Sequence, residues 1–290
     1  MKILLLGRSG QVGAALAPLL RRFGPVFAPT HAEVDLARPD SVRDAVRACS
    51  PSLIVNAAAY TAVDRAESEP ELARAVNAEA LGVLAREASR YDALLVHYST
   101  DYVFDGTKSA PYVEDDAPAP LGVYGQTKLA GEQAVLASDC RHLIFRTSWV
   151  YAATGRNFLL TMLRLAREQP RLRVVDDQRG APTSARAIAR GTVQALDYAL
   201  GDSGLDGVYH MTAGGQTSWH GFACAILARA GLDTPVDPIP TSAYPTPARR
   251  PLNSLLDNAR LAARFGVRLP DWEAGLDETL KELAAASAAT

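Results

Sequence analysis

The sequence predicts an α/β protein built on a doubly wound parallel sheet, with a smaller domain interleaved toward the C-terminus. Two patterns predict this fold. Short, continuous apolar runs alternate with helical patterns through the first half of the chain, and the first run leads directly into the glycine-rich turn Gly7-x-x-Gly10-x-x-Gly13. Continuous apolar strands interleaved with helices are typical of a parallel sheet that helices cover on both faces.

In the first half, apolar runs and helical spacing alternate in chain order. Apolar residues from Val12 to Phe23 recur at helical spacing, which predicts a helix directly after the glycine-rich turn. Further helices are expected over Ser41–Ala48, Glu71–Ser89 and Tyr124–Leu136. The expected strands are Lys2–Leu6, Val26–Ala28, Leu53–Val55, Leu94–Tyr98 and Leu143–Phe145.

After Trp149 the alternation becomes less regular. We expect helices over Phe158–Arg167 and Ala185–Leu200, an extended segment at Arg173–Val175, and a closing helix at about Asp271–Ala286. Prolines cluster between positions 235 and 251, which predicts an ordered loop over a site because proline interrupts regular structure.

These patterns predict two interleaved domains. Residues 1–150 are expected to form a Rossmann-type dinucleotide-binding domain, to which about 185–210 return. Residues 151–184 and 211–290 are expected to form the substrate-binding domain.

The bulk composition is that of a soluble globular protein. The 290 residues are 48% hydrophobic and 21% charged, and the net charge of −2 indicates neither a nucleic-acid nor a membrane partner. Three widely separated cysteines predict no disulfide framework and no zinc site. The first expected strand begins at Lys2, and no apolar run has the roughly 20 residues that span a bilayer. We therefore expect a cytoplasmic protein.

The glycine-rich turn favours dinucleotide binding because it follows an apolar strand directly. One glycine permits a backbone conformation closed to other residues, another lets a pyrophosphate approach the main chain, and the third allows close packing of helix on strand. The amides at the start of the helix then attract the phosphates. Gln11 and Val12 are expected beneath the cofactor.

The cofactor is expected to be NADPH or NADH. Thr30-His31 occupies the place after the second strand where a carboxylate usually binds the adenosine ribose and repels a 2′-phosphate. We therefore expect NADPH to be used at least as well as NADH. Asp35-Leu36 lies a little further on and is a candidate to border the adenine, although a solvated loop position is the alternative for Asp35.

Tyr124 and Lys128 lie four residues apart and predict acid–base chemistry on one helix face. A free tyrosine keeps its proton at neutral pH because its pKa is about 10, and a neighbouring ammonium lowers that pKa. Thr100 follows an apolar strand, at the sheet edge where ligands bind, so its hydroxyl is placed to polarise the substrate oxygen that Tyr124 protonates. Together with a dinucleotide site, this pattern predicts a carbonyl reductase.

Several longer motifs carry a family resemblance. They are NAAAYTAVDRAESEP (56–70), HYSTDYVFDG (97–106), VYGQTKLAGE (123–132), HLIFRTSWVY (142–151), DDQRGAPT (176–183) and YPTPARRPLNS (244–254). With these motifs the chain resembles the extended short-chain dehydrogenase/reductase family, and within it the dTDP-4-dehydrorhamnose reductases.

The resemblance implies a reaction and a set of site residues. The reaction is hydride transfer from the nicotinamide to C4 of dTDP-4-dehydro-L-rhamnose, with Tyr124 as proton donor, giving dTDP-L-rhamnose. The resemblance places Thr100, Asp101 and Trp149 at the sugar. It places Gly10, Gln11, Val12, Asp35, Leu36, Ala59, Thr61, Tyr98 and Lys128 around the cofactor.

The resemblance also assigns the nucleotide end of the substrate to the C-terminal domain. Arg249-Arg250-Pro251 suits that role because a diphosphate needs cationic partners, and a solvated basic pair is the alternative.

One departure from the family concerns metal binding. In some relatives a magnesium ion bridges two subunits through three glutamates, but here the corresponding positions hold Ala15, Arg186 and Glu282. One carboxylate beside a cation is a poor site for a hard metal, so no metal site and no metal-bridged homodimer are expected.

Two other interpretations stay open at the level of sequence. One is another nucleotide-sugar reductase or epimerase, although no extra acid–base group for an epimerase can be placed. The other is a non-catalytic regulatory subunit of the same fold, against which the presence of Thr100, Tyr124 and Lys128 argues.

Overall fold

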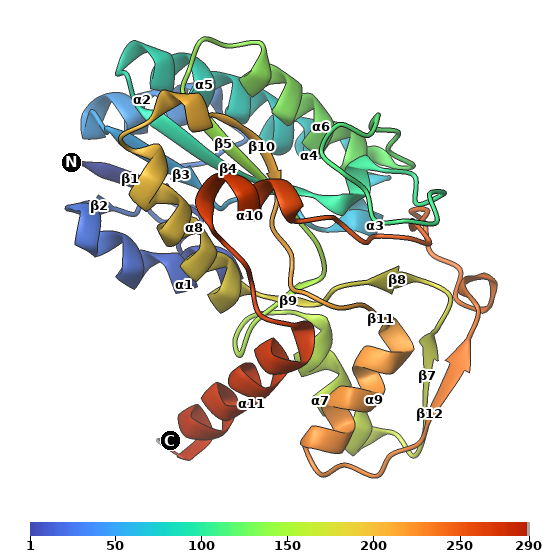
Figure 1. The fold of residues 1–290 in the computed structure, drawn as a ribbon. Helices are drawn as coiled ribbons and strands as arrows, with labels where there is room; N and C mark the ends of the chain where they lie inside the picture. The colour runs from blue at the N-terminus through green and yellow to red at the C-terminus, as the bar shows by residue number, and fades with distance from the viewer. Residues whose placement is uncertain (289–290) are drawn as a thin grey trace.

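A computed structural model describes residues 1–288 and places a six-stranded parallel sheet at the centre of the larger of two units (Figure 1). All neighbouring strands of this sheet run parallel. The predicted α/β fold with a doubly wound parallel sheet is therefore confirmed. In sheet order the strands are β10 (Gly207–His210), β5 (His142–Thr147), β4 (Leu94–Thr100), β3 (Leu53–Asn56), β1 (Ile3–Leu6) and β2 (Val26–Phe27).

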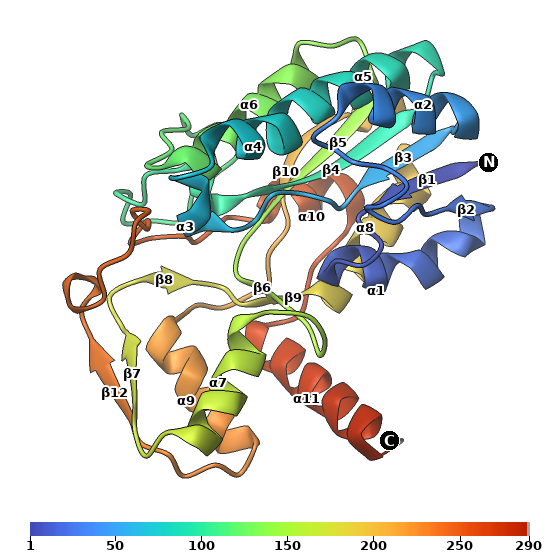
Figure 2. The same cartoon turned by 180° about the vertical axis from the view of Figure 1, so that it is seen from behind.

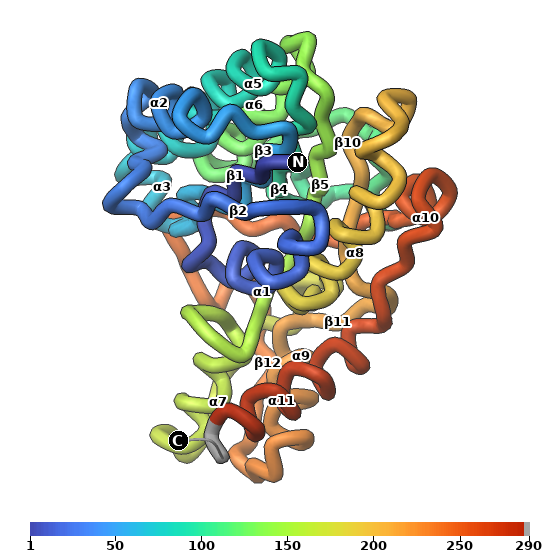
Figure 3. Tube along the Cα trace, turned by 90° about the vertical axis from the view of Figure 1, so that its left-hand side faces the viewer, coloured from blue at the N-terminus to red at the C-terminus, as the bar shows by residue number. Residues whose placement is uncertain are grey.

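Helices cover both faces of the sheet, as Figure 3 shows from the side. One face carries α2 (Pro39–Cys49), α5 (Ala80–Arg90) and α6 (Val123–Leu136). The other carries α1 (Gln11–Leu20), α8 (Ala185–Ala199) and α10 (Ala259–Phe265).

Alternation along each strand explains the two layers. In β1, Ile3 and Leu5 belong to the core beneath α1 and α8, whereas Leu4 and Leu6 belong to the core beneath α2 and α5. Successive side chains of a strand point to opposite faces, so a strand that is apolar throughout needs a helix layer on each side.

The smaller unit has its own core and lies below the carboxyl edge of the sheet (Figure 2). Its elements are α7 (Phe158–Glu168), α9 (Trp219–Arg229), α11 (Trp272–Ala288) and the paired strands β7 (Leu172–Val175) and β12 (Val236–Ile239). Short strand pairs lead into it: β6 (Val150–Tyr151) with β9 (Thr183–Ser184), and β8 (Arg179–Gly180) with β11 (Thr217–Ser218).

The chain crosses between the two units more than once. Residues 185–210 pack with the sheet through α8 and β10, and α10 returns to the same core through Leu261 and Phe265. The domain limits at 150, 184 and 211 stay predictions, and the last two residues of the range 211–290 lie outside the described residues.

The helix predicted over Glu71–Ser89 is interrupted. It is divided into α4 (Pro70–Arg74), a π-helical turn (Ala75–Glu79) and α5, and it follows the short helix α3 (Val63–Ala66). The side chain of Asn77 in the π-helical turn bonds the main chain of Tyr60 and the hydroxyl of Thr127. These contacts explain the interruption, since a π-turn aims a side chain that a regular helix would direct elsewhere.

The proline cluster is only partly a loop. Val236–Ile239 forms β12 despite Pro238, because β12 lies in a two-stranded sheet where its free edge needs no partner. The segment from Pro240 to Pro251 has one short 3-10 turn and otherwise no regular structure, as predicted. The 3-10 turns of the chain are Arg21–Phe23, Asp101–Val103, Ser203–Leu205 and Thr241–Ala243.

A buried ion pair joins α6 to the sheet. Arg146 in β5 donates from Nε and Nη2 to the carboxylate of Glu132 in α6, the shortest distance being 2.7 Å from Nη2 to Oε2. Their side chains are 5% and 1% exposed. Because α6 carries Tyr124 and Lys128, this pair fixes the helix on which the predicted catalysis depends.

Replacing Glu132 by alanine should therefore destabilise the fold by about 3–5 kcal/mol, because the Arg146 guanidinium would stay buried without its partner. Urea unfolding gives the free energy. The matched control is Glu168→Ala, which breaks an exposed pair with Arg164 and should cost less than about 1 kcal/mol. Similar small losses in both variants would contradict the structural role of the buried pair.

Candidate active site

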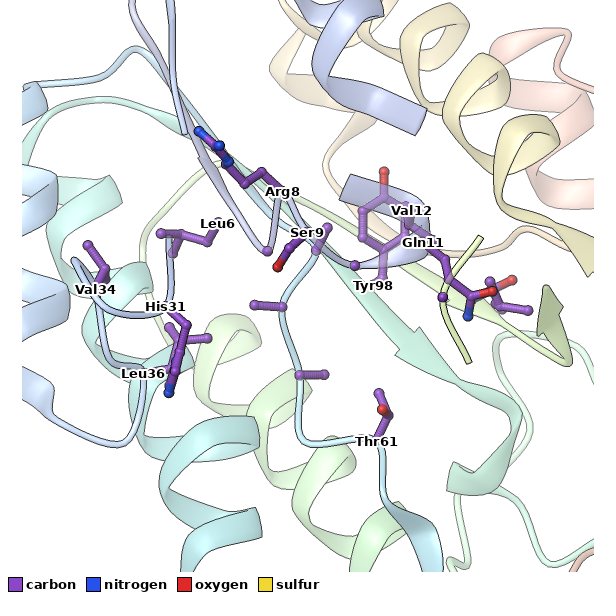
Figure 4. A pocket seen from close by; sticks show the side chains of 18 of the residues that line it. Leu6, Arg8, Ser9, Gln11, Val12, His31, Val34, Leu36, Thr61 and Tyr98 are labelled. Atoms are coloured by element: carbon purple, nitrogen blue, oxygen red, sulfur yellow. The ribbon is translucent and has the colours of Figure 1, made fainter. Parts of the chain in front are cut away.

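A cavity of about 460 Å³ opens at the carboxyl edge of the sheet, where the chain leaves β1 and β3 (Figure 4). The connections after β1 and β3 lead to opposite faces of the sheet, which makes this the switch point where open α/β sheets bind ligands. The predicted cofactor residues that line the cavity are Gly7, Gly10, Gln11, Val12, Leu36, Ala59, Thr61, Tyr98, Tyr124 and Lys128.

The glycine-rich turn is built as the sequence predicted. Gly7 has a φ of +82°, and a Cβ there would lie 2.6 Å from the Ala58 nitrogen. A Cβ on Gly13 would lie 2.1 Å from the Gly7 oxygen, so Gly13 allows α1 to pack on the turn and does not itself line the cavity. At this turn the cavity wall consists of backbone without side chains. We call this surface the cradle, and its shape fits a dinucleotide pyrophosphate.

One end of the cavity is bordered by Arg8, Thr30 and His31. Figure 4 shows His31 beside Leu36 and the side chain of Arg8 further away, on the other side of Leu6. Arg8 donates from Nη1 to the Ala28 carbonyl oxygen at 3.1 Å. Asp35 is not among the lining residues, because its carboxylate accepts the Ala37 N–H and holds the turn before α2.

Tyr124 lies at the other end and holds its proton firmly. Burial raises the pKa of Tyr124 to about 12, opposed by a hydrogen bond with Thr100 and assisted by the nearby Asp101 carboxylate. Thr100 ends β4 and donates to Asp101 Oδ1 at 3.0 Å. The structure therefore brings the predicted Thr100 and Tyr124 together, with the phenol protonated at neutral pH.

Asp101 is buried directly behind this pair. Burial raises its pKa to about 6, while hydrogen bonds from Ser254 and Thr100 act in the opposite direction. Ser254 belongs to the C-terminal segment, so that segment closes over the strand end that carries Thr100.

Lys128 is 1% exposed, and its environment differs from the one expected. Its Nζ donates to the Tyr98 carbonyl oxygen at 2.6 Å and lies 2.9 Å from His97 Nε2. Burial lowers the pKa of Lys128 to about 7, against the opposing charge of Glu132. The expectation that its ammonium lowers the pKa of Tyr124 is not met, because the amine is directed to these two partners instead.

Trp149 stands where the chain passes into the smaller unit. Its ring stacks on Trp219 with centroids 3.6 Å apart, and Gly180 leaves the space for it, since a Cβ there would lie 2.4 Å from the indole. Trp149 has a φ of +49°, a strained conformation for a bulky residue that the stacking holds in place.

A second cavity of about 570 Å³ lies in the smaller unit. Its wall includes Trp219, Tyr244 and Arg250. Arg250 pairs through Nη2 with Asp64 at 2.8 Å, while its buried Nη1 has no hydrogen-bond partner among the described residues. Arg249 is exposed and does not line this cavity. The two arginines thus have different surroundings, which the sequence did not distinguish.

Other lining residues were not singled out from the sequence. Arg8 and Ser9 are the variable positions of the glycine-rich turn, so the motif itself contained the signal for them. Gly155 and Arg156 reach the same cavity from a loop that has no motif. No local pattern could have identified that pair, since only the tertiary fold brings the loop to the turn.

The positions that correspond to metal ligands in some relatives form other contacts here. Arg186 forms ion pairs with Glu278 and Glu282, and Ala15 packs against the core beneath α1. Within residues 1–288 no three His, Cys, Asp or Glu side chains cluster as metal ligands would. The absence of a metal-bridged homodimer stays a prediction.

No helix within the part of the chain that the structure describes has both the length and the apolar character required to cross a bilayer.

Comparison with known proteins gives consistent matches over almost the whole chain. Residues 1–285 match the family model described as the RmlD substrate binding domain. A dTDP-4-dehydrorhamnose reductase of Burkholderia thailandensis is 52% identical, with 98% of this chain and 99% of the relative covered.

Two solved structures agree closely with this fold. A dTDP-4-dehydrorhamnose reductase of Clostridium acetobutylicum matches with a TM-score of 0.93 and 36% identity, covering 98% of this chain and 100% of its own. The enzyme of Bacillus anthracis, solved in complex with NADP, matches with a TM-score of 0.91 and 34% identity, covering 97% and 99%.

Proposed function

Because the chain belongs to the dTDP-4-dehydrorhamnose reductase family, we infer that it reduces the C4 carbonyl of dTDP-4-dehydro-L-rhamnose with NADPH or NADH, giving dTDP-L-rhamnose. The observation that carries this function is the position of Tyr124. It is a half-buried, protonated phenol beside Thr100, at the end of a cavity whose other walls would hold a dinucleotide. A purified enzyme that oxidises NADPH when given this substrate would establish the activity, and no oxidation would reject it.

A nicotinamide dinucleotide bound in the cradle supplies the hydride. Thr100, beside Tyr124 but not itself among the residues that line the cavity, is proposed to bond the substrate oxygen, and Tyr124 to give that oxygen its proton as the C4 carbonyl becomes an alcohol. Lys128 lines the same wall, where its amine is available to the ribose hydroxyls. Thr100 and Lys128 are buried and Tyr124 is half-buried, which limits the access of water to the reacting atoms.

We place the nucleotide end of the substrate in the second cavity. The unpartnered Nη1 of Arg250 supports a diphosphate contact, since a buried guanidinium N–H favours an anionic acceptor. Trp219 and Tyr244 offer flat apolar surface for a base or a deoxysugar. Asp101 and Trp149 are proposed at the sugar and Arg249 near the diphosphate, although none of the three lines either cavity.

We propose that each of the two domains binds one of the two ligands. Residues 1–150 with 185–210 would bind the dinucleotide, and 151–184 with the remaining C-terminal residues would bind the nucleotide sugar. A cytoplasmic location is proposed as well, supported by three free cysteines that suit a reducing compartment.

Tyr124→Phe should lower kcat by about 10²–10⁴-fold, because the ring still packs while the transferable proton is gone. Steady-state assays with NADPH measure the loss, and fluorescence titration should show that NADPH binding is kept. Tyr198→Phe, at an exposed position, is the matched control and should leave kcat unchanged. Near-normal turnover of the Tyr124 variant would remove Tyr124 from the role of proton donor.

Arg8→Ala should reduce kcat/KM for NADPH by about tenfold or more and affect NADH far less, since a charged hydrogen bond to the 2′-phosphate would be lost. We expect this contact because Arg8 and His31 border one end of the cavity, and the Asp35 carboxylate, which would repel a 2′-phosphate, does not line it. The test compares kcat/KM for NADPH and for NADH in this variant and in the control variant Arg90→Ala. Arg90 is an exposed residue of α5. Equal losses with both cofactors would refute the phosphate contact.

Arg250→Ala should raise KM for the nucleotide sugar by about tenfold or more, with KM for NADPH unchanged, because a charged diphosphate contact is lost. Arg249→Ala should have a smaller effect, as its side chain is exposed. Both KM values come from initial rates at varied substrate and cofactor. The assignment would be wrong if substrate KM stayed the same in the Arg250 variant.

A further inference from the structure

A loop of the smaller unit lies beside the glycine-rich turn of the larger unit. This loop, residues 152–157, joins β6 to α7, and we call it the strap. Gly155 and Arg156 of the strap line the first cavity together with Gly10 and Gln11. A Cβ on Gly155 would lie 3.6 Å from Cγ of Gln11, so the strap lies next to the Gln11 side chain.

Asn157 binds the strap to Gln11. Its Oδ1 accepts the Leu160 N–H at 3.0 Å and caps α7, which fixes the orientation of the amide with Nδ2 toward the strap. Nδ2 donates at 2.9 Å to Gln11 Oε1 and at 2.9 Å to the Ala152 carbonyl oxygen, and it lies 3.2 Å from the Thr154 carbonyl oxygen. One side chain therefore holds the strap in shape, caps α7 and contacts the first residue of α1.

The start of α1 is open to an anion. Its N-cap residue, Gly10, has no side chain to accept the first amides, and the first turn of the helix contains no acidic residue. Helix amides without an acceptor favour an anionic ligand. Because Gly10 and Gln11 line the cavity at this point, a dinucleotide diphosphate would bind here, next to the strap.

The cavity wall carries basic side chains. Within residues 1–288 it includes Arg8, Lys128 and Arg156 and no aspartate or glutamate. Two of these side chains donate to main-chain carbonyl oxygens, Arg8 at 3.1 Å and Lys128 at 2.6 Å. Arg156 is exposed and forms no hydrogen bond or ion pair with the described part of the chain. Its whole guanidinium is therefore available to a ligand at the start of α1.

We propose that Arg156 binds the diphosphate of the nicotinamide dinucleotide, and that Asn157 is a positioning residue that holds the strap in place for this contact. The inference rests on the proposed function only in taking a dinucleotide as the ligand. A guanidinium suits the contact because its parallel N–H groups match two phosphate oxygens. The contact would add a residue of the smaller unit to cofactor binding, beyond the division of the two ligands between the domains.

Arg156→Ala should raise the Kd for NADPH and for NADH by a similar factor of about five to ten, because both cofactors carry the diphosphate. Fluorescence titration without substrate gives both Kd values. Arg156→Lys should recover part of the affinity, since the positive charge is kept. Arg167→Ala is the matched control and should leave both values unchanged, because Arg167 is an exposed arginine of α7 that does not line the cavity.

Unchanged Kd values in Arg156→Ala would overturn the diphosphate contact. A loss confined to NADPH would overturn it as well, because it would assign Arg156 to the 2′-phosphate. The titrations need no turnover, so a protein that binds both cofactors without reducing the sugar would still decide the contact. A wild-type protein that binds neither cofactor would reject the proposed function together with the contact.

The role of Asn157 is tested by a double-mutant cycle with Arg156. Asn157→Ser keeps a cap on α7, because serine also accepts an amide N–H at this position, but it removes the donor to Gln11. Alone it should raise the Kd for NADPH by about threefold, and in the Arg156→Ala background it should add little, because the cation that it positions is already gone. Additive losses would show that Asn157 acts independently of Arg156 and would overturn its positioning role.

Discussion

The buried ion pair between Glu132 and Arg146 is the interaction on which the site depends most. It ties α6 to β5 in a place where neither charge reaches water, so the two elements cannot shift against each other without exposing an unpaired charge to the core. Tyr124 and Lys128 lie on the same helix, and Thr100 ends the neighbouring strand β4. The relative positions of Thr100, Tyr124 and Lys128 thus depend on a helix–sheet contact outside the cavity.

Burial also sets the charge of each group at the site. The same loss of water raises the pKa of Tyr124 and Asp101 and lowers that of Lys128 and His97, because the charged form is the one that burial penalises in every case. The outcome is a phenol that keeps its proton and a lysine that titrates near neutrality. Both properties suit a reductase that must deliver one proton for each hydride.

In the proposed function, the two cavities divide recognition between the two units of the fold. The glycine-rich turn offers bare backbone and a helix start, which suit a pyrophosphate, whereas the second cavity offers aromatic surface and a guanidinium. The C-terminal segment lies against both units: Arg250 pairs with Asp64 and Ser254 reaches Asp101 in the larger unit, while the Arg179 N–H of the smaller unit donates to the Leu252 carbonyl oxygen. One stretch of chain would in this way connect the proposed site of reduction at the sheet edge with the proposed nucleotide site.

The sequence by itself determined the parallel sheet, the glycine-rich turn and the Thr100–Tyr124 pair, because each depends on a local pattern: apolar runs, glycine spacing, or residues at a strand end and on one helix turn. It missed β10, α9 and α10, and it did not show that the helix after Glu71 is interrupted at Asn77. Only the tertiary structure decided that Asp35 turns away from the cavity, that Arg250 and Arg249 differ, and that Lys128 faces His97 rather than Tyr124. Those outcomes depend on which distant groups compete for the same hydrogen bond, and sequence spacing carries no information about such competitors.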